Sequence, residues 1–350
     1  MLYNAKNLHG GDIYAGDIDL DFSANTNPFG LPEGVKAAIV HAVSRLDRYP
    51  DPYCRALIPA IAAYEKIPES FVLCGNGAAE LIYSWCGAAH PKSALELAPT
   101  FSEYSLALER AGCEVHRHLL REDEDFAVTK RLLADIEKLR PDAVFLCDPN
   151  NPTGRLMDPS LKAKLLETCA QLGIMLFADE CFIGFTDGAS YVSKASAYPN
   201  LTVLKAFTKS YGMAGVRLGC VISSCGNLLH GMSRTVQPWN VSTVAQEAGT
   251  AALAEVGFIE KTRQLIEKER PRIASALSAM GLRVFPSDAN FILIRGPGTL
   301  GERLREKRIA VRDCSDYFGL SKGFYRIAVK LPEQNDRLIE AIRGVLWQKA

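Results

Sequence analysis

Short, fully apolar segments that alternate with helix-like segments constrain the fold of this chain more than any other feature of its sequence. Residues 143–147 and 174–178 are apolar strands of this kind, and residues 94–97 and 201–207 are further strands of the same series. A strand that is apolar on both faces has to be covered on both faces, as in a parallel sheet whose crossover connections are helices. We therefore expect an α/β fold with a mostly parallel central sheet sandwiched by helices.

Helical spacing of apolar residues fills the intervals between these strands and continues beyond them. The predicted helices lie at 33–45, 55–66, 78–88, 103–111 and 159–171, and further strands lie at 71–73, 114–118 and 217–222. A long helical stretch at 255–280 precedes short strands at 290–294 and 325–329 and a final helix that starts at Pro332.

The length of 350 residues exceeds what a single hydrophobic core usually serves, so we expect two domains. The first thirty residues are polar and rich in glycine and asparagine, which indicates an extended arm. The alternating pattern gives way to the long helix near residues 240–255. We predict an arm at 1–30, a large cofactor-binding domain at 31–245 and a smaller α+β domain at 246–350.

Charge and hydropathy argue against several kinds of partner. Forty Lys and Arg residues balance forty Asp and Glu residues, so neither nucleic acid nor an anionic membrane is an expected partner. No apolar run approaches the roughly 20 residues of a membrane helix. Residues 1–16 lack the basic flank and the apolar stretch of a signal peptide. We expect a cytoplasmic protein.

The ten cysteines occur singly, and the sequence contains no Cys-x-x-Cys pair. Without a secretory signal, free thiols in a reducing compartment explain them better than a disulfide framework. Several lie in apolar strand-like runs, where cysteine behaves as a small hydrophobic residue. We predict no metal site.

The candidate catalytic residues lie just after strands, at the sheet edge where open α/β proteins bind their ligands. Lys209 follows the strand at 201–207 in a loop of small residues, where its amine could form an imine with an aldehyde cofactor. An isolated lysine of this kind would more often be a solvated loop residue. The planar guanidinium of Arg217 could bind a phosphate through two hydrogen bonds. The ordinary alternative role for this arginine is a surface ion pair.

Three further strand ends carry weaker signals. One carboxylate of Asp179 and Glu180 could keep a pyridinium nitrogen protonated, while a Mg²⁺ ligand or a helix cap explains this pair equally well. Residues 148–154 form a turn for backbone reasons, and Asn151 within it could donate to an anionic ring oxygen. Residues 75–80 form a glycine loop that opens a helix, where backbone N–H groups bind phosphate.

The order and spacing of these segments resemble those of fold-type I pyridoxal 5′-phosphate (PLP) enzymes of the class I and II aminotransferase group. The resemblance runs from Asn25 to Val329 and rests on the Asn-Pro-Thr-Gly turn, the Asp-Glu pair, and Thr-Lys followed by an arginine. It implies PLP as cofactor and a homodimer. The most similar branch contains the histidinol-phosphate aminotransferases and the threonine-phosphate decarboxylases of cobalamin biosynthesis.

The resemblance implies a role for each matching position. Lys209 would carry the cofactor as a Schiff base and move protons at Cα, Asp179 would pair with the pyridine nitrogen, and Asn151 would bond the ring hydroxyl. The remaining cofactor contacts would come from Asn76, Gly77, Ala78, Phe101 (stacked on the ring), Thr208, Arg217 and, from the other subunit, Tyr49. The substrate carboxylate would bind Arg326, and the substrate phosphate would bind Arg312 and an arm that carries His9 and Asn27.

Ordinary alternatives remain for some of these positions: core packing for Phe101, a surface salt bridge for Arg312 and a mobile terminal residue for His9. Two positions also depart from the family pattern. Phe182 replaces a tyrosine that usually touches the ring hydroxyl, which removes a hydrogen bond and changes the electronics of the bound cofactor. Ala206 replaces a serine or threonine, so the phosphate cup loses a hydroxyl.

Three features favour the decarboxylase branch: the arm at 9–12 and 21–28, the C-terminal segments at 311–315 and 323–329, and Phe182. We expect a decarboxylase that converts L-threonine-O-3-phosphate to aminopropanol phosphate. The alternative is a histidinol-phosphate-type aminotransferase that uses 2-oxoglutarate. A more remote alternative is a non-catalytic binding module of the same fold, and the complete set of predicted catalytic residues argues against it.

Overall fold

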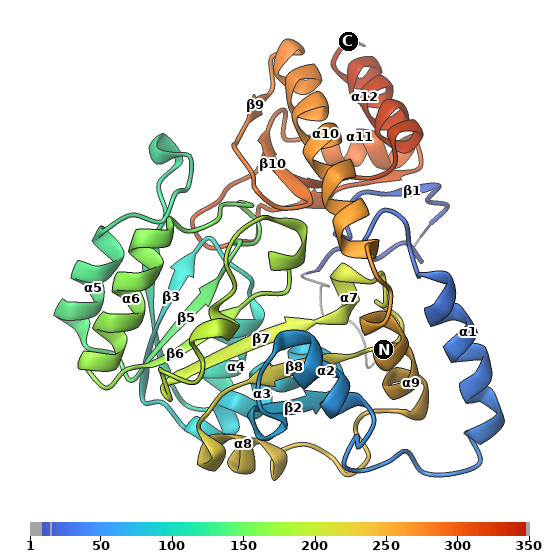
Figure 1. Cartoon of the computed structure of the whole chain (residues 1–350). Helices are drawn as coiled ribbons and strands as arrows, with labels where there is room; N and C mark the ends of the chain where they lie inside the picture. The colour runs from blue at the N-terminus through green and yellow to red at the C-terminus, as the bar shows by residue number, and fades with distance from the viewer. Residues whose placement is uncertain (1–8, 15, 348–350) are drawn as a thin grey trace.

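The computed structural model describes residues 9–14 and 16–347, which form a large and a small β-sheet with their helices (Figure 1). The large sheet has the strand order β2-β8-β7-β6-β5-β3-β4. All neighbouring strands run parallel except β8, which is antiparallel to both β7 and β2. The prediction of a mostly parallel sheet is therefore confirmed. Its strands are β2 (Val72–Gly75), β3 (Ser93–Ala98), β4 (Glu114–Leu119), β5 (Ala143–Cys147), β6 (Met175–Asp179), β7 (Leu201–Ala206) and β8 (Gly219–Ile222).

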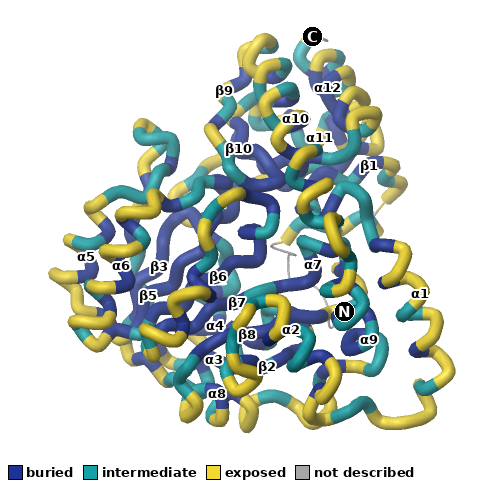
Figure 2. Tube along the Cα trace, in the orientation of Figure 1, coloured by how far each residue is buried: buried dark blue, intermediate teal, exposed yellow. Residues whose placement is uncertain are grey.

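Helices cover both faces of this sheet because its central strands are apolar on both faces. In β5, Val144 and Leu146 join the core cluster under α5 and α6, whereas Phe145 and Cys147 join the cluster under α3, α4 and α8. Figure 2 shows the buried strands between helices whose outer sides are exposed. The helices that belong to this part are α1 (Glu33–Ala42), α2 (Leu57–Glu65), α3 (Ala78–Ala89), α4 (Glu103–Arg110), α5 (Arg131–Leu139), α6 (Pro159–Gln171), α7 (Phe207–Ser210), α8 (Gly226–Ser233) and α9 (Thr243–Leu253).

The small sheet is antiparallel, with the strand order β12-β13-β10-β9. Helices α10 and α12 pack together beside it, and α11 packs against α12 (Figure 1). The elements of this part are α10 (Phe258–Ala279), β9 (Arg283–Val284), β10 (Phe291–Arg295), α11 (Leu300–Glu306), β11 (Ile309–Ala310), β12 (Arg312–Asp313), β13 (Phe324–Ala328) and α12 (Pro332–Trp347).

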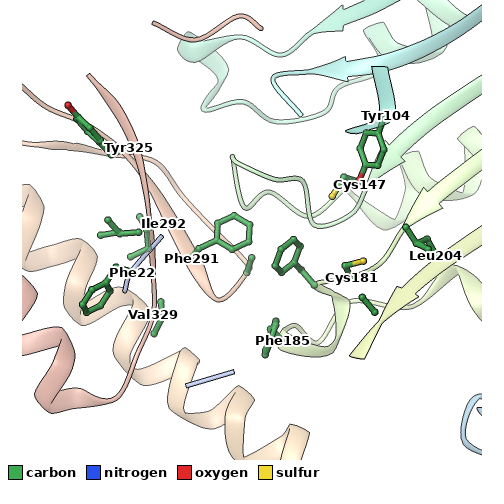
Figure 3. Close-up of a cluster of buried hydrophobic side chains, with 14 of the residues drawn as sticks. Phe22, Tyr104, Cys147, Cys181, Phe185, Leu204, Phe291, Ile292, Tyr325 and Val329 are labelled. Atoms are coloured by element: carbon green, nitrogen blue, oxygen red, sulfur yellow. The ribbon is translucent and has the colours of Figure 1, made fainter. Parts of the chain in front are cut away.

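The described part of the N-terminal arm is bound to this C-terminal part of the chain. Strand β1 (Leu20–Asp21) pairs in parallel with β11. The N–H of Phe22 donates to the carbonyl of Ala310, and the N–H of Ala328 donates to the carbonyl of Phe22. The Phe22 ring is fully buried near Ile292 and Val329 (Figure 3). The arm therefore forms part of the core of the C-terminal part of the chain.

The predicted boundary at residues 245/246 falls inside α9. Helix α9 packs against α1 and α2, and its buried residues share a cluster with residues of β2 and β8. Helix α10 is the first helix that packs against the small sheet. The division at residue 245 remains a prediction.

Two further sequence predictions concern the membrane and the cysteines. Among residues 9–14 and 16–347, no helix has both the length and the apolarity of a membrane span. All ten cysteines are free thiols, and only Cys225 is not fully buried. The prediction of free thiols is confirmed.

Candidate active site

A cavity of about 210 Å³ lies beyond the carboxyl ends of the central strands of the large sheet. It collects side chains from the loops after β3, β5, β6 and β7, from the start of α3, from the arm and from the small sheet. Most of the predicted site residues line it: His9, Ala78, Phe101, Asn151, Asp179, Thr208, Lys209, Arg217, Arg312 and Arg326.

Four predicted residues lie outside the lining of this cavity: Asn76, Asn27, Tyr49 and Gly77. Asn76 is exposed, and its backbone N–H donates to Oε2 of Glu80 at 2.7 Å. The buried Asn27 uses its side-chain nitrogen to bond the carbonyl of Ser210 (2.7 Å) and Oγ1 of Thr262 (2.8 Å). Its role in this structure is to anchor the arm behind Lys209, not to face a substrate.

Tyr49 is the third of these residues. Its side chain is 78% exposed and stacks on Trp239, with 4.5 Å between the ring centroids. It therefore lies at the surface, outside the cavity of its own chain, as a residue that serves a neighbouring subunit would.

Lys209 lies in the short helix α7, directly after β7. Burial, followed by the positive charge of Arg326, lowers the pKa of its amine to about 8. Nearby acidic groups, among them Asp179, oppose this shift without cancelling it. A substantial fraction of the amine is therefore neutral near pH 8, and only the neutral amine is a nucleophile.

Asp179 is the last residue of β6, and both of its carboxylate oxygens accept hydrogen bonds. Oδ1 accepts from the backbone N–H of Cys181 at 2.8 Å, and Oδ2 accepts from the hydroxyl of Tyr104 at 2.6 Å. Burial raises the pKa of Asp179, and hydrogen bonds from the Cys181 thiol, the Tyr104 hydroxyl and the Cys181 N–H act in the opposite direction. The result is a buried, oriented carboxylate that faces the cavity.

Glu180 does not share a site with Asp179. Its oxygens accept from Ser190 Oγ and from the backbone N–H of Tyr191, both at 2.5 Å, and Nζ of Lys205 lies 3.7 Å away. Neighbouring residues of a strand point to opposite faces of the sheet. The two acids therefore do not form the paired Mg²⁺ site that the sequence left open.

The orientation of the Asn151 amide follows from its partner. Nη1 of Arg326 donates a hydrogen bond to Oδ1 of Asn151, and the hydroxyl of Tyr317 lies 3.5 Å from the same oxygen. Because Oδ1 accepts these contacts, Nδ2 remains as a donor toward the cavity. Nη2 of Arg326 donates to the carbonyl of Ser23 at 2.7 Å, and its buried Nε has no partner among the described residues.

The start of α3 forms the opposite wall. Gly77 has a φ of 85°, and a Cβ at this position would lie 2.6 Å from Nη2 of Arg217, so only glycine fits. Its own N–H donates to the carbonyl of Gly75 at 2.8 Å, which corrects the expectation that this amide faces a ligand. Ala78 and Ala79 in the first turn of the helix line the cavity instead.

The arm borders the mouth of the cavity. Nε2 of His9 lies 2.8 Å from Oε1 of Glu103, and the His9 ring lies 5.5 Å from the ring of Phe101. Gly10 contacts Ser23 so closely that a Cβ on it would lie 2.2 Å from the Ser23 carbonyl oxygen. These contacts place His9 beside the predicted ring-stacking residue.

Several residues that line the cavity were not singled out in the sequence: Ser23, Ala79, Tyr104, Cys147, Cys181 and Tyr317. Tyr104 had a usable signal, because it lies three residues after Phe101 at the start of a helix, where the two side chains share a face. Tyr317 lies in an irregular loop, and no periodicity predicts where it points.

The chain belongs to the aminotransferase class I and II family, whose model matches residues 17–342. Its relatives include threonine-phosphate decarboxylase of Salmonella typhimurium, which is 36% identical over 99% of this chain and 98% of the relative. Histidinol-phosphate aminotransferase 2 of Archaeoglobus fulgidus is 33% identical over 93% of both chains. Among solved structures, histidinol-phosphate aminotransferase of Clostridium acetobutylicum has a TM-score of 0.87 and 29% identity, covering 93% of this chain and 99% of that one.

The predictions of a fold-type I PLP enzyme and of PLP as its cofactor are confirmed by this membership. The residues present also fit the cofactor. An amine, a buried carboxylate and an amide donor line one cavity with the start of α3 and Arg217. Gly77 lies so close to Arg217 that a side chain on it would fill the space between them. Because glycine has no side chain, a phosphate has room there.

Proposed function

We propose that this chain is a PLP-dependent decarboxylase that converts O-phospho-L-threonine to aminopropanol phosphate and CO₂ in cobalamin biosynthesis. The observation that carries the proposal is a pair of arginines on the small sheet. Arg312 and Arg326 are directly opposite each other on β12 and β13, and both are more than 90% buried and line the cavity.

Like charges directly opposite on neighbouring strands destabilise a sheet unless something offsets them. Asp316 accepts from Nη2 of Arg312 at 2.8 Å and neutralises part of the charge. The unpartnered Nε of Arg326 still requires an acceptor. A substrate with both a carboxylate and a phosphate supplies one anion for each arginine, and an amino-acid phosphate is such a molecule.

We assign the roles at the cofactor end as follows. When bound, PLP supplies an aldehyde that condenses with the substrate amine and a ring that accepts the electrons of a breaking bond at Cα. Arg217, Thr208 and the first turn of α3 bind its phosphate. Asp179 would hold the pyridine nitrogen, and Nδ2 of Asn151 would donate to the ring hydroxyl.

The reaction depends on which bond at the substrate Cα lies perpendicular to the plane of the cofactor ring. In our proposal Arg326 holds the carboxylate and Arg312, with His9, holds the phosphate, so that the bond between Cα and the carboxylate is perpendicular. Loss of CO₂ would leave Cα in need of a proton, and Lys209 would deliver it. The pKa of Lys209, lowered to about 8, lets its amine gain and lose a proton near neutral pH.

Transamination is the second candidate, and the similarity to two histidinol-phosphate aminotransferases favours it. If the bond between Cα and hydrogen is the perpendicular one, Lys209 removes that proton and no CO₂ forms. The amino group would then pass to an acceptor such as 2-oxoglutarate.

A paired assay separates the two reactions. PLP-loaded protein is mixed with O-phospho-L-threonine while CO₂ release and the absorption spectrum of the cofactor are followed together. CO₂ with an unchanged cofactor band supports the decarboxylase. Loss of that band without CO₂ identifies an aminotransferase, and the absence of both CO₂ and aminopropanol phosphate removes the decarboxylase proposal.

Arg312→Gln tests the substrate assignment independently. Loss of a charge-assisted hydrogen bond to phosphate should raise KM for phosphothreonine about 10- to 100-fold. The PLP affinity and the cofactor spectrum should stay as in the wild type. An unchanged KM would contradict the assignment of Arg312.

We further propose that the protein is a cytoplasmic homodimer. Large apolar side chains are exposed around α1, at Val40 (73%), Val43 (60%) and Leu46 (55%), and Tyr49 follows them. Exposed apolar residues that gather on one element mark an interface more often than a free surface. Ten free thiols fit a reducing compartment.

A further inference from the structure

Tyr104 is a buried tyrosine whose hydroxyl serves the predicted cofactor carboxylate. It lies in the first turn of α4, is fully buried, and donates to Oδ2 of Asp179 at 2.6 Å. Its ring packs against Phe101 and Phe145, with centroid distances of 5.6 and 5.8 Å. In Figure 3 the hydroxyl of Tyr104 is directed toward Cys147, the residue that pairs with Asp179 across β5 and β6.

Packing alone does not explain a hydroxyl at this position. The surroundings of the ring are apolar, and a phenylalanine would fill the same space without a polar group to satisfy. Burial, and next the Asp179 charge, raise the pKa of Tyr104 well above its ordinary value, so the phenol stays protonated and acts as a donor. The hydroxyl therefore acts on Asp179 and not on the core.

Besides the Tyr104 hydroxyl, the hydrogen bonds that support a negative charge on Asp179 come from the thiol and the backbone N–H of its neighbour Cys181. Cys147 and Cys181 lie beside it, and burial, then Asp179 itself, raises the pKa of both thiols, so they remain neutral. The positive charge of Lys209 is the smallest of the effects that favour its ionised form. The donors to this carboxylate among the described residues are the Cys181 thiol, the Tyr104 hydroxyl and the Cys181 N–H.

We propose that Tyr104 is a positioning residue that keeps Asp179 ionised and aimed at the pyridine nitrogen of PLP, so that this nitrogen stays protonated. The inference rests on the proposed role of Asp179 but not on the choice between decarboxylation and transamination. Removal of the hydroxyl makes the carboxylate more basic, and the shared proton then moves from the ring nitrogen toward Asp179.

The test is the protonation state of the pyridine nitrogen in Tyr104→Phe, measured by ¹⁵N NMR on protein loaded with ¹⁵N-labelled PLP. We expect the resonance to move from the position of the protonated nitrogen toward that of the deprotonated one. We also expect PLP to bind about ten-fold more weakly, since one charge-assisted hydrogen bond is lost. Neither readout requires a substrate.

Tyr191→Phe is the matched control. Tyr191 is also fully buried, but its hydroxyl contacts Sδ of Met157 at 3.8 Å in the cluster on the other face of the sheet. The ¹⁵N resonance of PLP bound to Tyr191→Phe should equal that of PLP bound to the wild type. Asp179→Asn is the reference for a lost carboxylate, and adding Tyr104→Phe to it should change nothing further.

The outcomes are separable. A wild-type resonance in Tyr104→Phe, with a shifted resonance in Asp179→Asn, overturns the proposal and leaves Asp179 in place. A wild-type resonance in Asp179→Asn shows that the carboxylate does not control the nitrogen, which removes both the role of Asp179 and that of Tyr104. A shift in both variants with no additional shift in the double variant supports the proposal.

Discussion

Lys209 experiences opposing electrostatic influences. Burial and Arg326 favour its neutral form, whereas nearby acidic groups such as Asp179 favour its charged form, and burial dominates. A lysine in water has a pKa near 10.4 and is almost entirely protonated at neutral pH. The cavity therefore prepares the amine for attack on an aldehyde before any ligand arrives.

The first prediction concerns the capture of PLP by the cofactor-free protein. Because the pKa of the Lys209 amine is lowered to about 8, the neutral fraction rises with pH through that value. The rate of adduct formation, trapped by borohydride at a series of pH values, should rise with a midpoint near pH 8. Lys209→Ala should give no trapped adduct, and a midpoint above pH 10 would contradict a perturbed lysine.

A second residue-scale prediction concerns Glu96, which pairs with Arg117 across β3 and β4. Burial raises its pKa to about 7, and Arg117 opposes the shift. The folded protein thus binds a proton that the unfolded chain has already lost, so this group favours folding near pH 5 and penalises it as the pH rises through 7. The penalty above pH 8 is at most about 3 kcal/mol.

Glu96→Gln should remove this pH dependence. The unfolding midpoint of the wild type should fall between pH 5 and pH 8 by more than that of the variant, measured by urea titration of the cofactor-free protein. Glu109→Gln is the control, because Glu109 also contacts Arg117 (3.6 Å) but is 56% exposed. Equal pH slopes in wild type and Glu96→Gln would show that the pKa of Glu96 is not raised.

Helix α3 contributes to the site mainly through the glycine turn that precedes its first residue. The turn before it needs a residue with positive φ and no side chain, because Arg217 occupies the space where a Cβ would lie. Arg217 itself has a φ of 63°, a costly conformation for a residue other than glycine, which persists only where the surrounding contacts hold it. Its placement therefore depends on the fit against Gly77.

Gly77→Ala tests this fit. The variant should lose PLP affinity at least ten-fold, because the new Cβ displaces Arg217 from the phosphate end. Gly112→Ala is the matched control, since Gly112 has a similar φ of 79° but no atom within 4 Å of its would-be Cβ. Both substitutions should cost roughly 1–3 kcal/mol of stability through backbone strain, and only Gly77→Ala should weaken PLP binding as measured by fluorescence titration.

The sequence predicted the elements whose patterns are local. Strand β5 is a continuous apolar run, β6 is one up to Asp179, β3 and β7 are mainly apolar, and α6 and α10 have clear helical spacing. The two-residue strands β1, β9, β11 and β12 were not predicted, because they exist only through pairing with distant segments. Helices α5, α8, α9 and α11 were also missed, although α9, with 11 residues, is longer than the predicted α1, α2 and α4.

At the scale of the whole molecule, the predicted site residues fall into two groups. Lys209, Asp179 and Asn151 each follow a strand of the large sheet, so topology alone brings them to one edge. Arg312 and Arg326 reach the same cavity from the small sheet. Their place in the site was implied by the family resemblance and could not be predicted from the composition of the chain. Asn27 shows the limit of this reasoning. It was predicted to bind the substrate, but its side-chain amide donates hydrogen bonds to residues of α7 and α10.

The proposed dimer gives a prediction that requires two different chains. Tyr49→Phe and Lys209→Ala are co-expressed with separate tags and the mixed dimer is isolated. If Tyr49 serves the neighbouring site, one site of the mixed dimer has both wild-type residues and the other has neither. The mixed dimer should then bind PLP at one site with wild-type affinity. If Tyr49 serves its own chain, no intact site forms, and the wild-type affinity is absent.

The bond from Arg326 to the carbonyl of Ser23 joins residues that are 303 positions apart. During synthesis the ribosome releases the arm first and β13 almost last, so the arginine that we assign to the substrate carboxylate has no anchor until nearly the whole chain has emerged. The glycine turn, Asp179 and Lys209 are all made earlier. A nascent or C-terminally truncated chain thus has the groups that we assign to PLP but lacks Arg312 and Arg326, and the capacity for selective chemistry appears only with the finished protein.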